Sequence, residues 1–102
     1  MSNISAHISE NNHEVTISVL GRFDFSVHKE FRATYASLDA QAWKYILDLS
    51  QTEYMDSSAL GMILLLRDHV GGVKERVVVR NARSEVDKIL RIANFDKLLE
   101  LV

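Results

Sequence analysis

The sequence predicts an α/β fold, with a mixed β-sheet of four to five strands and helices packed mainly on one face. Apolar and polar residues alternate in residues 4–9 and 14–20, as they do in half-buried β-strands. From residue 14 onward, strand-like and helix-like patterns alternate, which favours parallel strands joined by right-handed helical crossovers. The 102 residues suffice for one compact domain, which we expect to span residues 1–102.

The two alternating segments near the amino terminus are expected to form an antiparallel pair. Ile4, Ala6 and Ile8 alternate with serine and histidine, and the polar residues 10–13 follow as a turn. The second segment repeats the alternation with valine and isoleucine, and Gly21 ends it.

A first helix is expected after Ser26, which can cap its first turn. The residues that recur at helical spacing are Val27, Phe31, Thr34 or Tyr35, and Leu38. The apolar run that begins at Trp43 contains residues 45–49, which we interpret as a central strand. Residues 50–55 are expected to connect this strand to the next helix.

The next helix carries the most apolar run of the chain. Asp56 is a good N-cap, because its carboxylate can accept hydrogen bonds from the first turn of N–H groups. Residues 60–66 are apolar on all sides except at Gly61, so most of this helix should be covered and Leu64 should lie deep in the core. Glycines 71–72 are typical of the end of a helix.

The last third of the chain predicts one more strand and one more helix. Residues 77–79 form the strand, residues 81–83 a loop, and Ser84 with Asp87 resembles a capping box. The buried face of the helix is expected to contain Val86, Ile89, Leu90 and Ala93. The apolar tail, residues 95–102, is expected to pack back as a short strand or a last turn.

The helix start at residues 56–58 is the strongest candidate for a functional site. Ser57 follows the capping aspartate, so its hydroxyl lies near unpaired N–H groups and the positive end of the helix dipole. Such a place suits a phosphate, and phosphorylation would add about −1.5 to −2 charges there. In a purely structural reading, Asp56, Ser57 and Ser58 only cap a core helix.

The sequence MDSSALG at residues 55–61, preceded by LDL at residues 47–49, resembles the signature of the STAS domain. The likeness is specifically to the stand-alone anti-sigma factor antagonists. It covers nearly the whole chain, and it includes GRFD at residues 21–24 and IANFDKL at residues 92–98. The fold that the resemblance implies is a single STAS-like domain. In that family the serine directly after the aspartate is phosphorylated, which here is Ser57.

The resemblance also implies a partner-binding surface formed by Asp24, Asp56, Ser57, Ser58 and Ala59. Asp24 and Ser57 both follow predicted strands, and sites in open α/β sheets lie at the carboxyl ends of the strands. A purely structural role of Asp24 in its loop is an equal alternative. Ala59 stands where the family often has glycine, a departure that bears on which partner fits.

By resemblance, the unphosphorylated protein binds a regulatory partner, often an anti-sigma factor that is also the serine kinase. Phosphorylation of the serine releases this partner, and a metal-dependent serine phosphatase restores the binding form. Capture of the anti-sigma factor frees the sigma factor for transcription in the bacterial cell. The alternative is a structural STAS subunit that binds a transport ATPase or a lipid-transport complex without being phosphorylated.

Catalytic chemistry has little support in the sequence. A nucleophilic serine needs a base within reach, whereas His69 lies about 18 Å from Ser57 along the same helix. His7, His13 and His28 are expected on the surface or partly in the core. Metal-ligand spacings and glycine-rich phosphate loops are absent from the sequence. We therefore expect a protein that is not an enzyme and holds no metal or cofactor.

The composition is that of an ordinary globular protein, with 47% hydrophobic and 25% charged residues. A net charge of −2 with scattered signs argues against direct nucleic-acid binding. The absence of cysteine fits a reducing compartment. The amino terminus does not resemble a signal peptide, and the longest apolar run is far shorter than the roughly 20 residues of a membrane span. We expect a cytoplasmic protein without a membrane partner.

Overall fold

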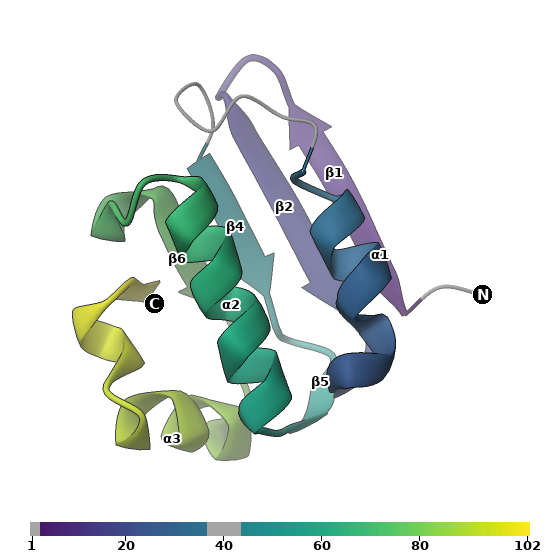
Figure 1. Ribbon diagram of the computed structural model, residues 1–102, viewed down its shortest axis with the longest axis vertical. Helices are drawn as coiled ribbons and strands as arrows, with labels where there is room; N and C mark the ends of the chain where they lie inside the picture. The colour runs from purple at the N-terminus through teal and green to yellow at the C-terminus, as the bar shows by residue number, and fades with distance from the viewer. Residues whose placement is uncertain (1–2, 37–43) are drawn as a thin grey trace.

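A five-stranded mixed sheet forms the centre of the molecule in Figure 1, a computed structural model that describes residues 3–36 and 44–102. The strand order is β1 (Ile4–Ser9), β2 (Glu14–Val19), β4 (Lys44–Asp48), β6 (Val77–Arg80) and β7 (Glu100–Leu101). β1 pairs antiparallel with β2, and the other pairs are parallel. The α/β class, the antiparallel pair and the central position of the apolar strand β4 are thus confirmed.

A second, two-stranded parallel sheet pairs β3 (Gly21–Phe23) with β5 (Thr52–Met55). β2 ends before Gly21, as predicted, but the sequence did not predict that Gly21 begins another strand. The prediction that residues 50–55 only connect two elements was wrong, since residues 52–55 form a strand. Gly21 adopts φ +73°, which few other residues tolerate, and its N–H donates to the Gln51 carbonyl at 2.9 Å. Strands of three and four residues are too short to show a periodic pattern.

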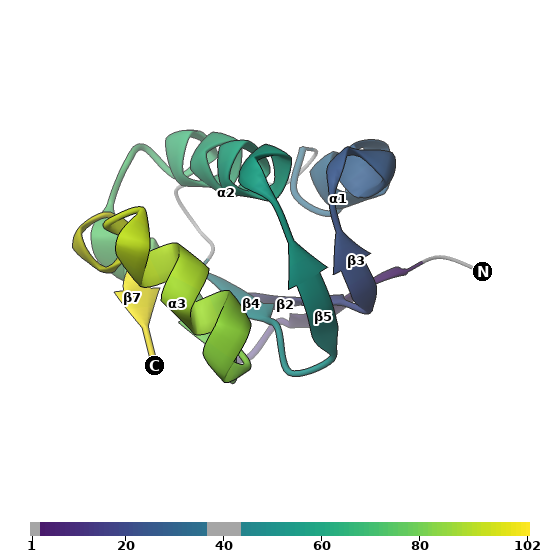
Figure 2. The ribbon, with the colours of Figure 1, turned by 90° about the horizontal axis from the view of Figure 1, so that it is seen from below.

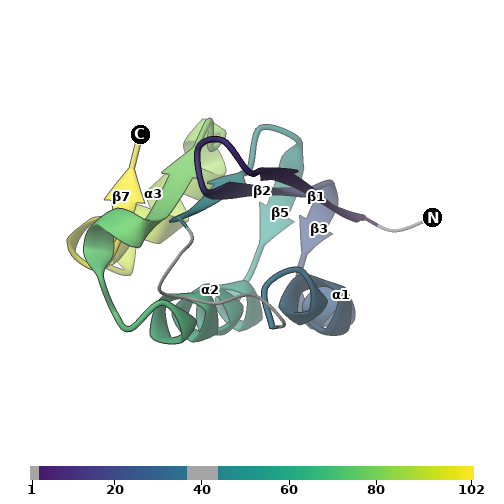
Figure 3. The same cartoon turned by 90° about the horizontal axis from the view of Figure 1, so that it is seen from above.

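The helices lie mainly on one face of the large sheet. A 3₁₀ turn, η1 (Phe25–Val27), leads into α1 (His28–Ala33), which lies beside α2 (Ser57–His69) on that face (Figures 2 and 3). A further turn, η2 (Lys74–Arg76), precedes β6, and α3 (Ser84–Ile92) packs against β5. The tail forms both a turn, η3 (Phe95–Lys97), and the strand β7. Leu38 and Trp43 lie outside the described residues.

The core fills the space between the large sheet and the helices α1, α2 and α3. Its fully buried side chains include Val15, Ile17, Val19, Phe23, Tyr45, Leu47, Leu49, Ile63, Leu66, Val77, Leu90 and Leu99. At roughly 1.5 to 3 kcal/mol for each large apolar side chain removed from water, this cluster is the main stabilising contribution. Ala59, Met62, Ile63 and Leu66 of α2 belong to this cluster, which fixes the position of the helix over the sheet.

α2 is less completely covered than its composition predicts. Ile63 and Leu66 are fully buried, but Leu64 is only half-buried and Leu65 is 59% exposed. The prediction that Leu64 lies deep in the core was wrong, because the sheet and the neighbouring helix cover only part of the helix circumference. The helix ends at His69, before two glycines with positive φ, as predicted.

β1 is also more exposed than its alternating pattern predicts. Ile4 is buried, whereas Ile8 is 47% exposed even though its neighbour in the register, Val15, is fully buried. The reason is position, since β1 forms the outer edge of the sheet.

Two capping assignments differ from the prediction. The N-cap of η1 is Asp24, not Ser26, because the carboxylate accepts from the Ser26 N–H. At α3, the N-cap is Arg83, whose side chain makes no capping hydrogen bond, and Ser84 is the first residue of the helix. The predicted capping box of Ser84 and Asp87 therefore does not form. Asp87 instead pairs with Arg91 one turn later, at 2.8 Å. The buried face of α3 is as predicted, with Val86 and Leu90 in the core.

Candidate functional site

The two short parallel strands bring two helix starts to one edge of the molecule. In their register, Phe23 lies opposite Met55. Asp24 and Asp56 follow these residues directly, and both are N-caps, of η1 and of α2. Figure 2 shows β3 and β5 running side by side toward α1 and α2. Asp24, Asp56, Ser57 and Ser58 are therefore brought to the same edge.

Asp56 caps α2 with one carboxylate oxygen. Its Oδ1 accepts from the Ser58 N–H at 3.0 Å, the Ser58 hydroxyl at 2.5 Å and the Ala59 N–H at 3.4 Å. The carboxylate thus satisfies N–H groups that have no partner within the helix. The predicted N-cap of α2 is confirmed.

The two serines behind Asp56 have different surroundings. The Ser58 hydroxyl donates to the cap carboxylate and is half-buried. Ser57 is exposed at the first position of the helix, and within residues 3–36 and 44–102 its hydroxyl has no hydrogen-bond partner. Ser57 is thus the hydroxyl that a second protein can reach.

Ala59, the position of the departure from the family pattern, faces the core. Its side chain is fully buried together with Met62 and Ile63 of the same helix. Its methyl group therefore does not contribute to the exposed surface, and the predicted partner contact through Ala59 has no exposed side chain to support it.

Asp24 forms a cap with nearly the same geometry. Its Oδ1 accepts from the Ser26 N–H at 3.0 Å and from the Ser26 hydroxyl at 2.5 Å. Arg22 donates from Nε to the other oxygen at 3.2 Å. The Ser26 hydroxyl, then its N–H, and more weakly Arg22 hold the pKa of Asp24 below its ordinary value.

Two exposed aromatic rings border this edge, and sequence reasoning did not find them. Phe25, directly after Asp24, is 63% exposed and stacks on His28 with the ring centroids 4.0 Å apart. Tyr54 is 40% exposed and lies under the Arg22 guanidinium, 4.0 Å from the ring centroid. Exposed aromatic and arginine side chains are typical of protein interfaces. One sequence signal could have identified Phe25 as exposed. It directly follows Asp24, just as Ser57 directly follows Asp56.

Within the described part of the chain, no three histidine, aspartate or glutamate side chains come together as a metal site would need. His69 ends α2 at the opposite end from Ser57, and its ring lies 4.9 Å from that of Tyr35. Of the described helices, none is long and apolar enough to cross a membrane.

Comparisons with known proteins agree with this architecture. Residues 6–101 match the sequence model of the family described as "Mlab, STAS domain". A STAS-domain containing protein of Pseudomonas aeruginosa is 45% identical over 98 residues, which cover 96% of this chain and 97% of the relative.

Similar solved structures include anti-sigma factor antagonists. Unphosphorylated SpoIIAA matches with a TM-score of 0.74 at 20% identity, over 97% of this chain and 86% of SpoIIAA. The phosphorylated Bacillus cell fate determinant SpoIIAA matches at 0.72 and 19%, covering 97% and 90%. An antagonist of Mycobacterium paratuberculosis matches at 0.68 and 19%, covering 99% and 89%. The family match and the fold together show that this chain belongs to the STAS domain family.

Proposed function

We propose that this protein is an anti-sigma factor antagonist that acts as a phosphorylation-switched binding module. Its unphosphorylated form binds a regulatory partner, an anti-sigma factor or related serine kinase, and phosphorylation of Ser57 releases that partner. A serine phosphatase restores the binding form. The observation that carries the proposal is the exposed hydroxyl of Ser57 at the first position of a 13-residue helix whose cap does not use it.

The fold should tolerate a phosphate at this position. The first turn of α2 presents N–H groups and the positive end of the helix dipole, which stabilise an added negative charge by about 0.3–1 kcal/mol. Ser57 is exposed, so the phosphate can remain in water. Phosphorylation should therefore change the surface without unfolding the helix behind it.

Binding should be affected much more than folding. A partner that covers the first turn of α2 must remove the phosphate from water and hold it beside the carboxylates of Asp24 and Asp56. A cost of roughly 3 kcal/mol at the contact weakens binding about a hundredfold. The proposed contact surface consists of Asp24, Asp56, Ser57 and Ser58, bordered by Phe25 and Tyr54.

The comparisons support the proposal at the level of the fold. SpoIIAA, which is named as an anti-sigma factor antagonist, has been solved in an unphosphorylated and a phosphorylated form, and both resemble this chain. At 19–20% identity, these matches bear on the fold rather than on the partner.

The second candidate is a STAS subunit of a transport or lipid-transport complex that is not phosphorylated. It is retained because the matching family is described as "Mlab, STAS domain", and the relative at 45% identity is named only as a STAS-domain protein. A pull-down with Ser57→Ala as bait separates the two candidates by the protein recovered. A serine kinase or anti-sigma factor supports the switch, and a transport ATPase supports the alternative.

Phosphosite mapping tests the proposal directly. The kinase recovered in this way is incubated with ATP and with the wild-type protein, Ser57→Ala or Ser58→Ala. We expect mass spectrometry to find one phosphate, on Ser57, which Ser57→Ala abolishes and Ser58→Ala keeps. A phosphate found only on Ser58 would contradict the assignment.

A further inference from the structure

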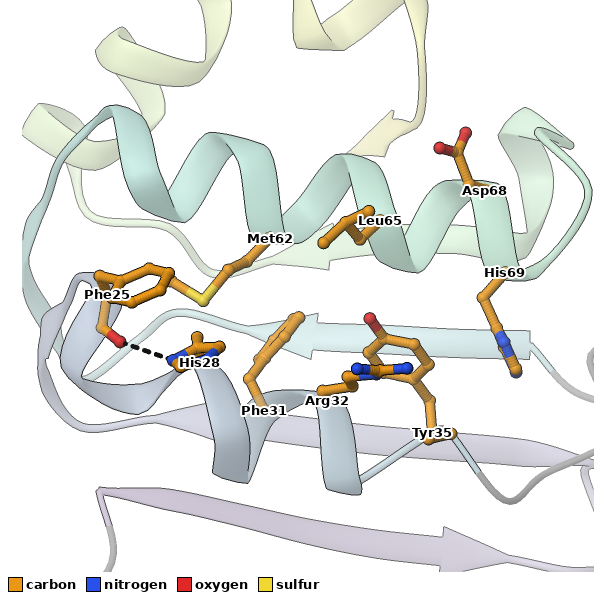
Figure 4. Close-up of a pocket in the computed structure, with 10 residues that line it drawn as sticks. Phe25, His28, Phe31, Arg32, Tyr35, Met62, Leu65, Asp68 and His69 are labelled. Carbon is orange, nitrogen blue, oxygen red and sulfur yellow. Dashed lines mark hydrogen bonds between the residues drawn. The ribbon is translucent and has the colours of Figure 1, made fainter.

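An apolar groove runs between α1 and α2, beginning next to the proposed contact surface (Figure 4). Its volume is about 620 Å³. The side chains that line it are Phe25, His28, Phe31, Arg32, Tyr35, Met62, Leu65 and His69, together with Ala36 and Asp68. In Figure 4 the Met62 sulfur points toward the Phe25 ring, and Asp68 points away from α1.

The walls of this groove expose large apolar side chains. Phe25 on one wall is 63% exposed, and Leu65 on the other is 59% exposed. A pocket for a small molecule normally encloses 70–90% of its ligand, whereas this groove is partly open to solvent. Exposed apolar surface of this kind occurs at sites for a protein, a membrane or a ligand, and the exposure of both walls favours a protein.

The exposed side of α2 leads from Leu65 in the groove toward the proposed phosphorylation site. Ser57, Gly61 and Leu65 are spaced four residues apart, so they lie along one side of the helix. A side chain placed on Gly61 would meet no atom within 4 Å, so the surface between Ser57 and Leu65 is unobstructed. A partner in the groove can therefore reach the first turn of α2.

The rim that α1 contributes is basic. Arg32 and His28 line the groove, and Arg32 is exposed. Lys29, one turn before Arg32, is exposed beside it. Glu30 is two positions from Arg32 and so points to a different side of the helix. A partner segment that packs along α1 is therefore favoured if it carries carboxylates.

We propose that this groove binds an amphipathic α-helix of the partner. Its apolar side chains, spaced i, i+4 and i+7, would pack on Phe25, Met62 and Leu65, and its acidic side chains would face Lys29 and Arg32. A helix as long as the 13-residue α2 spans about 20 Å, enough to reach from the groove to Ser57. The inference rests on the proposed function, because it names the segment that a phosphate on Ser57 would repel.

The same features disfavour a second copy of this chain as the occupant. In a symmetric dimer both copies contribute the same patch to the contact, so the like charges of both α1 rims would lie within one interface. An acidic helix meets no such repulsion. It also gives the phosphate a direct effect, since a dianion on Ser57 repels carboxylates in the segment beside it.

The test uses a phage-displayed library of 14-residue helical peptides, selected on the unmodified protein. We expect the enriched peptides to carry apolar residues at i, i+4 and i+7 and acidic residues on one flank. Leu65→Ser and Phe25→Ser should each weaken these peptides at least tenfold, and Arg32→Glu should weaken them at low salt. Ile92→Ser, which removes a 72% exposed side chain from α3, is the matched control and should change nothing.

Several results would overturn the inference. These are enriched peptides that are unaffected by Leu65→Ser, peptides with basic instead of acidic flanks, or a library without binders. One-to-one binding of dodecanoate that Leu65→Ser abolishes, with no peptide bound, would identify a small amphiphile as the occupant. A dimer in sedimentation that Leu65→Ser dissociates would identify a second copy.

The peptide test needs no kinase, so the two proposals can fail separately. If peptides bind in the groove but phosphorylation does not change the affinity for the partner, the groove proposal holds and the switch proposal fails. If phosphorylation of Ser57 weakens partner binding but Leu65→Ser binds the partner at full affinity, the switch proposal holds and the groove proposal fails.

Discussion

Two helix starts in this protein are built alike and differ in the residue that each leaves exposed. Asp24 and Asp56 both have extended backbones, with φ −138° and −125°. In both, the carboxylate accepts from the N–H and the hydroxyl of the serine two residues later, at 3.0 and 2.5 Å. The exposed residue between aspartate and serine is Phe25 in one case and Ser57 in the other.

This difference separates capping from function. The first helix start shows that an Asp-x-Ser cap forms with phenylalanine in the middle, so the cap makes no demand for a hydroxyl there. Capping therefore accounts for Asp56 and Ser58 but not for Ser57. The purely structural reading of residues 56–58 therefore gives Ser57 no role, whereas the proposed phosphorylation switch gives it one.

The largest effect should come from the packing behind the second cap. Ile63 is fully buried on the inner side of α2. Ile63→Ala should therefore lower the free energy of unfolding by about 2–5 kcal/mol through lost burial and a residual cavity. The matched variant Leu64→Ala should cost clearly less, because Leu64 is half-buried. Urea denaturation measures both. Equal losses would mean that the helix is packed differently from the structure.

Removing the caps should have a smaller effect, and an unequal one. Asp56→Ala should lower the free energy of unfolding by about 0.5–2 kcal/mol, because two helical N–H groups lose their acceptor. Asp24→Ala should lower the melting temperature less, since Asp24 serves one N–H group at a short 3₁₀ turn. Thermal melting followed by circular dichroism compares them. If Asp24→Ala lowers the melting temperature more than Asp56→Ala does, Asp56 is not the more stabilising of the two caps.

The smallest effect concerns the titration of Asp24. Its folded-state pKa lies below the ordinary 3.8, chiefly because of the Ser26 hydroxyl. The carboxylate therefore adds stability above the unfolded pKa, and this stability is lost as the pH falls through the folded pKa. Ser26→Ala should move the pKa of Asp24 up toward its ordinary value, whereas Ser58→Ala should leave it unchanged. Carbon-detected NMR titration of the carboxyl group measures the shift, and an unmoved pKa in Ser26→Ala would contradict the cap geometry.

The sequence was most informative where a single element determines its own pattern. The apolar run of β4 identified it as a central strand, and Asp56 before the apolar helix was recognisable as its cap. At the first helix, Ser26 was the predicted cap, and Asp24 was given a structural role in its loop only as an alternative to partner binding. Only the structure shows that the serine donates to the aspartate, so that one cap uses both residues.

The parts that the sequence did not predict depend on contacts between distant segments. β3 pairs with β5 across the whole of α1 and β4, and each strand is too short to reveal itself by alternation. Because this pairing sets Asp24 beside the start of α2, the composition of the edge was only partly predictable. The burial of Leu64 was misjudged for a related reason, since apolar residues all around a helix do not tell which side a neighbour covers.

The most direct test of the switch measures binding and folding on one sample that carries phosphoserine at position 57. The unmodified protein, Ser57→Ala and Ser57→Asp serve as references against the partner recovered with Ser57→Ala. We predict a roughly hundredfold loss of affinity on phosphorylation, a partial loss for Ser57→Asp, which adds one charge, and full binding by Ser57→Ala. The melting transition should remain. Unchanged affinity would contradict the account, and lost affinity with a collapsed melting transition would show that the phosphate acts by unfolding α2 instead of altering its surface.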